Sequence, residues 1–214
     1  MTVALYVLGA YLLGAIPFGV IIGRARGVDI REHGSRNIGA TNVGRVLGRK
    51  WGYLCLILDL LKGLGPTLVA KFALVPEIPD AAAHGQWVLV AAATVIGHTF
   101  PVYLGFKGGK GVATTIGAAL GLFPHVTIAM VIALIAYAAA RYGTGIVSVG
   151  SLALAVVFPA ALLAYLGLRG LPLSAHWPLV AVAGALGLLV ILRHRANIGR
   201  LLRGEEPRVA KKAE

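Results

Sequence analysis

The stretch "YLGFKGGKGVATT" (residues 103–115) contains residues that together suit the binding of an oxyanion. These residues are Lys107, Gly108, Gly109, Lys110 and Gly111. Glycines let backbone amides approach an anion closely, lysines supply positive charge, and the helix expected from Val112 would add its dipole. The Walker pattern fails, because Leu104 replaces its first glycine and Gly111 stands where Ser or Thr should bind magnesium. We therefore predict a phosphate-binding loop of another kind, with orientation anchoring by the two lysines as the alternative.

A second polar segment, "HGSRNIGATNVGR" (residues 33–45), is rich in short side chains that donate hydrogen bonds and in flexible glycines. Its candidate residues are Ser35, Asn37, Gly39, Ala40, Thr41, Asn42 and Arg45. Such side chains and glycine amides suit an anion-binding nest, and a following helix would add its positive N-terminal end. An N-capping loop made of turn residues would use the same residue types, so both interpretations stay open.

The third polar segment, "RHRANIGRLLRGEE" (residues 193–206), carries four arginines at the end of the last apolar run. Contact with lipid headgroups explains most of this positive charge. His194 and Asn197, however, lie three residues apart on one helical face, so both can reach the same ligand. The following tail, about residues 207–214, is expected to be flexible and solvated.

Asp59 and Lys62 lie within an apolar run, where an isolated charge is costly and a partner is expected. Their i,i+3 spacing favours a structural ion pair over direct catalysis. We expect His98 to be an interior histidine or a helix-end contact rather than a ligand.

The elements that must position these clusters are transmembrane helices. The 214 residues are 58% hydrophobic and only 13% charged, and the mean hydropathy is +0.83. So few charges cannot cover a soluble domain of this size, which predicts an all-α integral membrane protein. The net charge of +12 suggests an anionic partner. Nucleic acid is a poor candidate, because the basic residues alternate with apolar runs and few aromatic residues accompany them.

We expect a single transmembrane domain over residues 1–214. Its seven apolar segments lie near residues 3–23, 51–72, 86–104, 112–123, 125–141, 146–167 and 178–192. The fourth and fifth are shorter than the ~20 residues of a straight span, and they could form one helix broken at Pro124.

Charge favours seven spans with the N-terminus outside and the C-terminus in the cytoplasm. That arrangement places 17 Lys and Arg residues inside and 2 outside, whereas fusing the fourth and fifth segments gives 10 inside and 9 outside. The positive-inside rule prefers the first count. Residues 24–50, 105–111 and 193–206 are then all predicted to face the cytoplasm.

The acidic residues on this face argue against metal-dependent phosphotransfer. They are Asp29, Glu32, Glu205 and Glu206, and they form no D-x-x-D pair that could hold magnesium. There is no G-x-S-x-G elbow, no zinc-ligand spacing and no histidine followed by aspartate five residues later. We therefore expect a substrate that carries one or two phosphates, with no metal and no cofactor.

The three polar segments together resemble the signature loops of the bacterial acyl-phosphate:glycerol-3-phosphate acyltransferases. The matching stretches are "GSRNIGATNVGR" (34–45), "GHTFPVYLGFKGGKGVAT" (97–114) and "RHRANIGRLLRGEE" (193–206). The second has one residue fewer before Phe106 than the family pattern, and Arg36 stands where glycine is frequent. Order, spacing and the predicted seven spans agree along essentially the whole chain.

The resemblance implies transfer of a fatty acyl group from acyl phosphate to the 1-hydroxyl of glycerol 3-phosphate. This reaction gives lysophosphatidic acid and phosphate, needs neither coenzyme A nor acyl carrier protein, and begins bacterial phospholipid synthesis. It further implies a multi-pass protein of the bacterial cytoplasmic (inner) membrane, surrounded by lipids, with its active site facing the cytoplasm.

The resemblance also implies a role for each cluster. Glycerol 3-phosphate would be surrounded by Ser35, Arg45, Lys107, Lys110, His194 and Asn197. The acyl-phosphate group would be held by Asn37, Gly39, Ala40, Thr41, Asn42, Gly108, Gly109 and Gly111. His194 is a candidate base, and the resemblance favours a phosphate oxygen of the substrate as the proton acceptor instead.

Two other functions fit a basic, membrane-embedded site. One is a transporter or channel for phosphorylated metabolites, and the other is a transferase that uses a nucleotide-activated lipid. The first is disfavoured because the outer side has little charge to receive an anion, and the second because carboxylates are missing.

Overall fold

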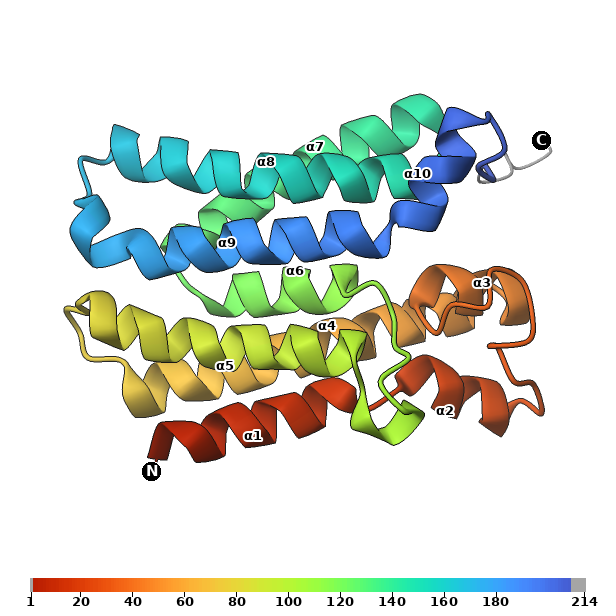
Figure 1. Ribbon diagram of the computed structural model, residues 1–214, viewed down its shortest axis with the longest axis horizontal. Coiled ribbons are helices and arrows are strands. Elements are labelled where there is room, and N and C mark those ends of the chain that lie inside the picture. Colours follow the sequence, from red (N-terminus) through yellow and green to blue (C-terminus); the bar gives the residue numbers. More distant parts are fainter. Residues whose placement is uncertain (1, 209–214) are drawn as a thin grey trace. The chain divides into compact units, whose positions relative to one another are not determined.

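The computed structural model describes residues 2–208, and these residues are helices joined by loops (Figure 1). The helices are α1 (Thr2–Ala15), α2 (Phe18–Ala25), α3 (Ala40–Leu47), α4 (Arg49–Leu74), α5 (Ala81–Thr99), the 3₁₀ turn η1 (Val102–Leu104), α6 (Val112–Gly121), α7 (His125–Thr144), α8 (Val147–Leu168), α9 (Leu173–Arg193) and α10 (Arg195–Leu202). The expected all-α fold is confirmed for the part of the chain that is described.

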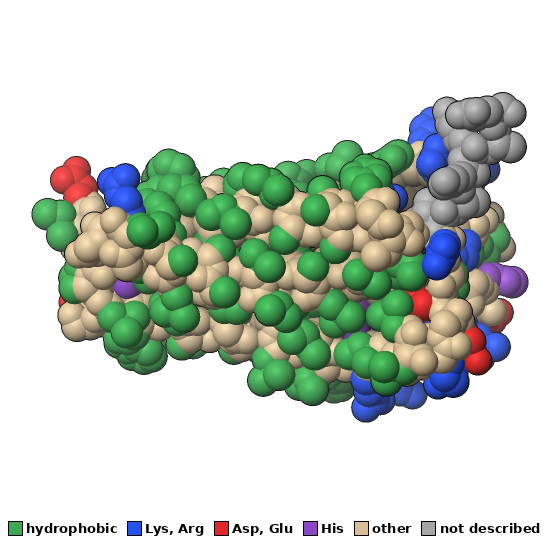
Figure 2. Space-filling model, turned by 90° about the horizontal axis from the view of Figure 1, so that it is seen from above, with side chains coloured by type: hydrophobic (Ala, Val, Ile, Leu, Met, Phe, Trp, Pro, Cys, Tyr) green, Lys and Arg blue, Asp and Glu red, His purple; other side chains and the backbone are tan. Residues whose placement is uncertain are grey.

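Six segments among the described residues are long and apolar enough to cross a membrane. They are Val3–Ala25, Arg49–Leu74, Ala81–Leu104, His125–Thr144, Val147–Leu168 and Leu173–Arg193. In the view of Figure 2, hydrophobic side chains are spread among tan atoms over the middle of the face, and Lys and Arg are absent from that middle. The protein is therefore an integral membrane protein by composition and length of its helices.

Several of the expected segments differ from the helices, among them the third, which begins at Ala81 rather than 86. The fifth segment extends to Thr144 rather than ending at 141, so α7 is long enough to span. The last segment begins at Leu173 rather than 178, because Pro178 is accommodated inside α9. The first segment is two helices, α1 and α2, interrupted at Ile16 and Pro17, since proline cannot donate to the helical ladder.

The chain divides into two compact units, residues 1–122 and 123–214. Within the first unit, α4 packs on α6 and α1 packs on α5 through glycines. A Cβ on Gly63 or Gly117 would overlap a backbone carbonyl of the facing helix, and the same holds for Gly97 against α1. The expectation that small residues serve close helix packing is thus confirmed here. The expectation of a single domain stays a prediction.

The second unit is built from α7, α8 and α9, each packed on the next, with α10 following α9. Gly150 of α8 lies against Tyr137 of α7, and Gly187 of α9 lies against the carbonyl of Ala155. Phe158 and Leu162 of α8 are fully buried in this unit. The packing holds the start of α8 and the end of α9 in place, where the polar residues of this unit lie.

Candidate active site

The first polar loop (residues 33–45) is braced from within by Asn42, which lies in α3 and is 1% exposed. Its side-chain oxygen accepts the amide of Ser35 at 2.8 Å, and its Nδ2 donates to the carbonyls of Ile30 and His33 at 3.0 and 3.1 Å. Both N–H groups of the amide are therefore bonded to backbone carbonyls of the loop and of the segment before it. The prediction that Asn42 holds substrate is replaced by a positioning role.

The middle of the first polar loop prepares the start of α3. Asn37 accepts the amide of Gly39 at 2.9 Å in an Asx turn, and Gly39 is the residue before the helix. The amides of Ala40 and Thr41 belong to the first turn, which has no intrahelical acceptor. The sequence placed a helix after this loop, whereas α3 begins inside it, at Ala40, and leaves these two amides at its N-terminus.

Ser35 and Arg45 are exposed residues of the first polar loop. Gly34, beside Ser35, has φ +59° and would carry a Cβ 3.5 Å from Cδ of Arg45, so the arginine passes next to this turn. Arg36 has φ +58°, a left-handed conformation that costs most side chains about 1 kcal/mol. This backbone explains why glycine suits the position.

The glycine–lysine loop (residues 105–111) is anchored on the end of α5. The amide of Gly109 donates to the carbonyl of His98 at 3.1 Å, and the amide of Gly108 donates to that of Thr99 at 3.2 Å. The expectation that these two amides point at an anion was therefore wrong. Glycine is required here by close packing, because a Cβ on Gly109 would overlap Nε2 of His98, and one on Gly108 would overlap its carbonyl.

Three buried hydroxyls lie near the start of α6, next to Gly111, which adopts φ +80°. The hydroxyls of Thr99, Thr114 and Thr115 are buried and make no hydrogen bond with any residue between 2 and 208. A Cβ on Gly111 would lie 3.1 Å from the hydroxyl of Thr99 and 4.0 Å from that of Thr115. Because buried hydroxyls normally have partners, these groups mark a place where a polar ligand is expected.

Lys107 and Lys110 frame this loop, Lys107 exposed and Lys110 half-buried. The predicted helix start at Val112 is confirmed, so the α6 dipole favours negative charge beside both lysines. The loop thus combines cations, a helix N-terminus and buried hydroxyls.

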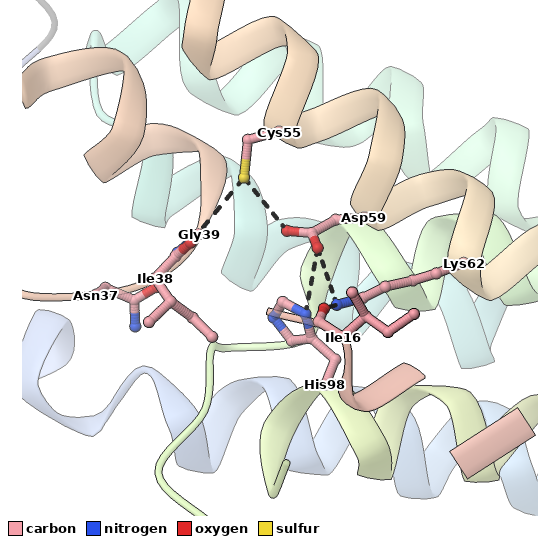
Figure 3. Close-up of polar contacts among 8 residues, drawn as sticks. All are labelled: Ile16, Asn37, Ile38, Gly39, Cys55, Asp59, Lys62 and His98. Atoms are coloured by element: carbon pink, nitrogen blue, oxygen red, sulfur yellow. Dashed lines mark hydrogen bonds and ion pairs between the residues drawn. The ribbon is translucent and has the colours of Figure 1, made fainter. Parts of the chain in front are cut away.

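A buried ion pair lies beneath this loop (Figure 3). Nζ of Lys62 is 2.9 Å from Oδ1 of Asp59, and both side chains are at most 4% exposed. Lys62 also donates to the carbonyl of Ile16 at 2.7 Å, at the break between α1 and α2. The ion pair predicted from the sequence is confirmed, and its structural rather than catalytic role stays a prediction.

His98 is buried, as expected, but its ring is not hydrogen-bonded at Nδ1. Nδ1 faces Oδ1 of Asp59 at 3.6 Å, slightly longer than a hydrogen bond. On the far side of Asp59, the thiol of Cys55 lies 3.6 Å from Oδ2 and 4.0 Å from the carbonyl of Ile38 in the first polar loop (Figure 3). Asp59 therefore lies between the two loops of this unit.

In the second unit, Glu206 organises the C-terminal cluster (residues 193–206). It accepts hydrogen bonds from Ser148 and Arg200, each at 2.7 Å, and from Asn197. Partial burial raises the pKa of Glu206, but the hydrogen bonds from Asn197, Ser148 and Arg200 lower it by more. The pKa of Glu206 therefore lies below its ordinary value. Glu206 joins the start of α8 to α10, a role that the sequence reasoning missed.

His194 ends α9 and precedes α10, and it is 2% exposed. Its Nδ1 lies 2.7 Å from the carbonyl of Val190. A carbonyl can only accept, so Nδ1 carries the proton and Nε2 is the basic nitrogen of the neutral ring. Asn197, one turn later, is also buried, and the expected side-by-side placement of the two residues on one turn is supported by the bond from the Ile198 amide to the His194 carbonyl.

An apolar groove of about 790 Å³ lies between α1 and α4 in the first unit. It is lined mainly by aliphatic side chains, with Phe18 near the helix break and Lys62 as its charged member. The small residues Gly9 and Gly65 form part of its wall. Such a groove suits a hydrocarbon chain, and Lys62 connects it to Asp59 and His98.

Sequence reasoning missed three features of the site. They are the buried threonine hydroxyls, the role of Glu206, and the contacts that run from Asp59 through His98 to Gly108 and Gly109. Spacing offered one signal, since Thr99 and Thr115 flank the glycine–lysine loop within the quoted motifs. Among residues 2–208, no three His, Cys, Asp or Glu side chains are grouped so that they could hold a metal ion.

Comparisons with known proteins agree over nearly the full length of the chain. A family model described as "Glycerol-3-phosphate acyltransferase" matches residues 4–204. The glycerol-3-phosphate acyltransferase of Anaeromyxobacter sp. (strain K) is 48% identical over 209 residues, which cover 96% of each chain. That of Aquifex aeolicus is 40% identical over 205 residues, which cover 94% of this chain and 96% of the relative.

Solved structures give the same result. The crystal structure of PlsY (YgiH), an integral membrane glycerol 3-phosphate acyltransferase, in its glycerol 3-phosphate form has a TM-score of 0.81 and is 36% identical. The similarity covers 98% of this chain and 96% of that one. The lysophosphatidic acid form of the same protein has a TM-score of 0.79.

Proposed function

The chain belongs to the glycerol-3-phosphate acyltransferase family, and on that premise we propose that it transfers a fatty acyl group from acyl phosphate to the 1-hydroxyl of glycerol 3-phosphate. The products are lysophosphatidic acid and inorganic phosphate, and the reaction is the first acylation of bacterial phospholipid synthesis. The observation that carries the proposal is that the family match, residues 4–204, includes the first polar loop, the glycine–lysine loop and nearly all of the C-terminal cluster.

The chemistry needs little from the protein beyond position and charge. The hydroxyl oxygen of glycerol 3-phosphate attacks the acyl carbonyl carbon, and the bond from that carbon to the phosphate oxygen breaks. Phosphate is a good leaving group in this mixed anhydride, so a protein nucleophile is unnecessary. The two substrates repel one another as anions, and cations, helix N-termini and buried hydroxyls offset that repulsion.

The first unit offers two anion-binding places for this purpose. One is the start of α3 with Ser35 and Arg45, and the other is the start of α6 with Lys107, Lys110 and the unpartnered hydroxyl of Thr99. We assign phosphate groups to these two places, because each provides helix N-terminal amides and a cation. Gly108 and Gly109 support the second place by packing rather than by donating to substrate.

His194 and Asn197 stay assigned to glycerol 3-phosphate, with Nε2 of His194 as the candidate acceptor of the hydroxyl proton. A phosphate oxygen of the substrate is the alternative acceptor. His194→Gln distinguishes them at saturating substrates. If Nε2 is the base, kcat falls about 100-fold or more; if the imidazole only binds, the change is mainly in KM.

We further propose that the groove between α1 and α4 receives the acyl chain. Its lining is almost wholly apolar, and it lies in two segments long enough to span the membrane. An acyl chain in this groove stays in a hydrocarbon environment while the phosphates lie at the polar loops. This arrangement explains how a membrane-embedded site joins a lipid-soluble donor to a water-soluble acceptor.

We also propose seven crossings in the cytoplasmic membrane, with the three polar clusters on the cytoplasmic side. The support is the positive-inside count, which needs α6 and the glycine–lysine loop to act together as one crossing. Reporter tags after Arg141 and at Glu214 test this proposal. Both tags should lie in the cytoplasm, and finding either tag outside would overturn the proposal.

The direct test is reconstitution of the reaction with purified protein in detergent. Palmitoyl phosphate and labelled glycerol 3-phosphate should give lysophosphatidic acid and one phosphate per turnover. Palmitoyl-coenzyme A and palmitoyl-acyl carrier protein should give no product without acyl phosphate. Uptake of glycerol 3-phosphate by proteoliposomes without acylated product would instead support the transporter.

A further inference from the structure

The buried Asp59–Lys62 pair has more contacts with other parts of the first unit than stability alone requires. A buried ion pair can often be replaced by apolar residues without loss of stability, because both charges must be desolvated. Here the pair is also tied to other parts of the first unit. Lys62 donates to the Ile16 carbonyl at 2.7 Å, and Oδ1 of Asp59 faces Nδ1 of His98 at 3.6 Å.

His98 in turn determines where the glycine–lysine loop lies. Its carbonyl accepts the amide of Gly109, and its neighbour Thr99 accepts the amide of Gly108. The imidazole occupies the space where a Cβ on Gly109 would be, so ring and backbone are in direct contact. Rotation of the ring therefore cannot leave the loop unchanged.

The orientation of that ring depends on Asp59. Nδ1 is buried and has no hydrogen bond to any described residue, and the carboxylate of Asp59 is the acceptor that it faces (Figure 3). A carboxylate favours the tautomer with the proton on Nδ1 and holds the ring plane. Lys62 holds that carboxylate in place through the 2.9 Å ion pair.

From these contacts we propose that Asp59, Lys62 and His98 form a positioning triad that sets the geometry of the glycine–lysine loop for binding a phosphate group. The inference rests on the proposed function only in that this loop binds a substrate phosphate. The triad acts through the backbone of Gly108 and Gly109 and does not itself touch the reacting atoms. Through Cys55 it also reaches the Ile38 carbonyl of the first polar loop.

The test separates a positioning role from a structural one by comparing single and double neutralisation. Asp59→Asn and Lys62→Met each leave one buried charge without its partner, so each should lower the unfolding temperature. The double variant Asp59→Asn/Lys62→Met leaves neither charge and should regain most of that stability. Reaction of a maleimide with Cys55, the single cysteine of the chain and fully buried, reports unfolding during heating.

If the triad positions the loop, the double variant regains stability but not activity. Its kcat/KM should remain about 100-fold below wild type, with a raised KM for glycerol 3-phosphate or acyl phosphate. A merely structural defect reduces the active fraction, which lowers apparent kcat and leaves both KM values unchanged. The proposal is overturned if the double variant has wild-type kcat and KM. Lys71→Met, the same substitution later in α4, is the matched control and should change neither constant.

A second variant and a readout independent of activity keep the test decisive if the double variant does not fold. His98→Asn leaves the Asp59–Lys62 pair intact but removes the ring beneath Gly109. In this variant, amide hydrogen exchange of Gly108 and Gly109 should become at least tenfold faster, because both amides are bonded to the displaced segment. Unchanged exchange together with unchanged kinetics rules the triad out. Wild-type protein that makes no lysophosphatidic acid would refute the proposed function instead, while the exchange measurement would still judge the triad.

Discussion

Replacing Gly109 with alanine isolates the contact between the glycine–lysine loop and His98. The new Cβ would overlap Nε2 of the ring and lie 2.9 Å from Cε1 and 3.1 Å from Cδ2. Ordinary contact between such atoms is at about 3.5–4 Å, so loop and ring must separate by about 1 Å or more. Gly109 does not have a positive φ, which means that the backbone itself accepts alanine and the effect is one of packing.

The size of the effect follows from that separation. A displacement of about 1 Å at a group that orients substrate costs about 100-fold in rate, or roughly 2.7 kcal/mol in activation free energy. Overpacking lowers the free energy of unfolding by about 1–3 kcal/mol in addition. Steady-state assays with palmitoyl phosphate and glycerol 3-phosphate give the first quantity, and thermal unfolding in detergent measures the second.

Gly85→Ala is the matched control, because it is the same substitution in α5 with no atom within 4 Å of the new Cβ. It should leave kcat/KM unchanged and stabilise the helix by up to about 1 kcal/mol. In a double-mutant cycle of Gly109→Ala with His98→Ala, the two losses should not add, because the second change makes room for the first. Wild-type kcat/KM in Gly109→Ala would refute the reasoning.

Three further predictions concern the carboxylate of Glu206, the backbone of Arg36 and the expected independence of the reaction from metal ions. Glu206→Gln removes a charge that accepts three hydrogen bonds, and should lower the free energy of unfolding by about 2–4 kcal/mol, since Arg200 is partly exposed and counts for less. The pKa of Glu206 is lowered in the fold, so the stability that its ionised carboxylate contributes is complete above the ordinary carboxyl range and is lost as pH falls through the lowered pKa. Unfolding measured as a function of pH should show this loss of stability at acid pH in wild type and not in Glu206→Gln. Arg36→Gly relieves a left-handed backbone and should raise the free energy of unfolding by up to about 1 kcal/mol, as thermal unfolding will report. Addition of EDTA should leave the acylation rate unchanged, and a loss restored by magnesium would contradict a metal-free mechanism.

The sequence predicted the helices of the membrane region because long apolar runs leave the backbone no other way to satisfy its hydrogen bonds. It also predicted the start of α6, because an apolar run begins directly after the glycine–lysine loop, but not the start of α3, which lies inside the first polar loop. The ion pair of Asp59 and Lys62 was predictable from spacing, because two charges three residues apart in an apolar helix have few other partners.

The direction of individual donors was not predictable. Gly108 and Gly109 were expected to present amides to an anion, yet those amides bond to the end of α5, a choice made by tertiary contacts. The direction in which the Asn42 side chain donates likewise depends on which carbonyls the folded loop brings within reach. Glu206 was counted only as an acidic residue of the third polar segment, since only the folded unit reveals that Ser148 meets it across 58 residues. Residues 209–214 of the predicted tail (about 207–214) lie outside the described residues.

The short length of α6 sets the depth at which the glycine–lysine loop lies. Its ten residues reach only about 15 Å, half of the ~30 Å hydrocarbon layer. It lies along α4, with Gly63 against Thr114 and Gly121 against Thr67, so its first turn is level with the middle of α4 (Figure 1). Non-helical backbone at such a level must be buried in protein or line a polar cavity, and the bonds of Gly108 and Gly109 to α5 meet that requirement. A full-length helix would move its N-terminus away from Asp59 and Lys62. The half-length helix instead keeps the phosphate-binding loop near Lys62, which lines the apolar groove.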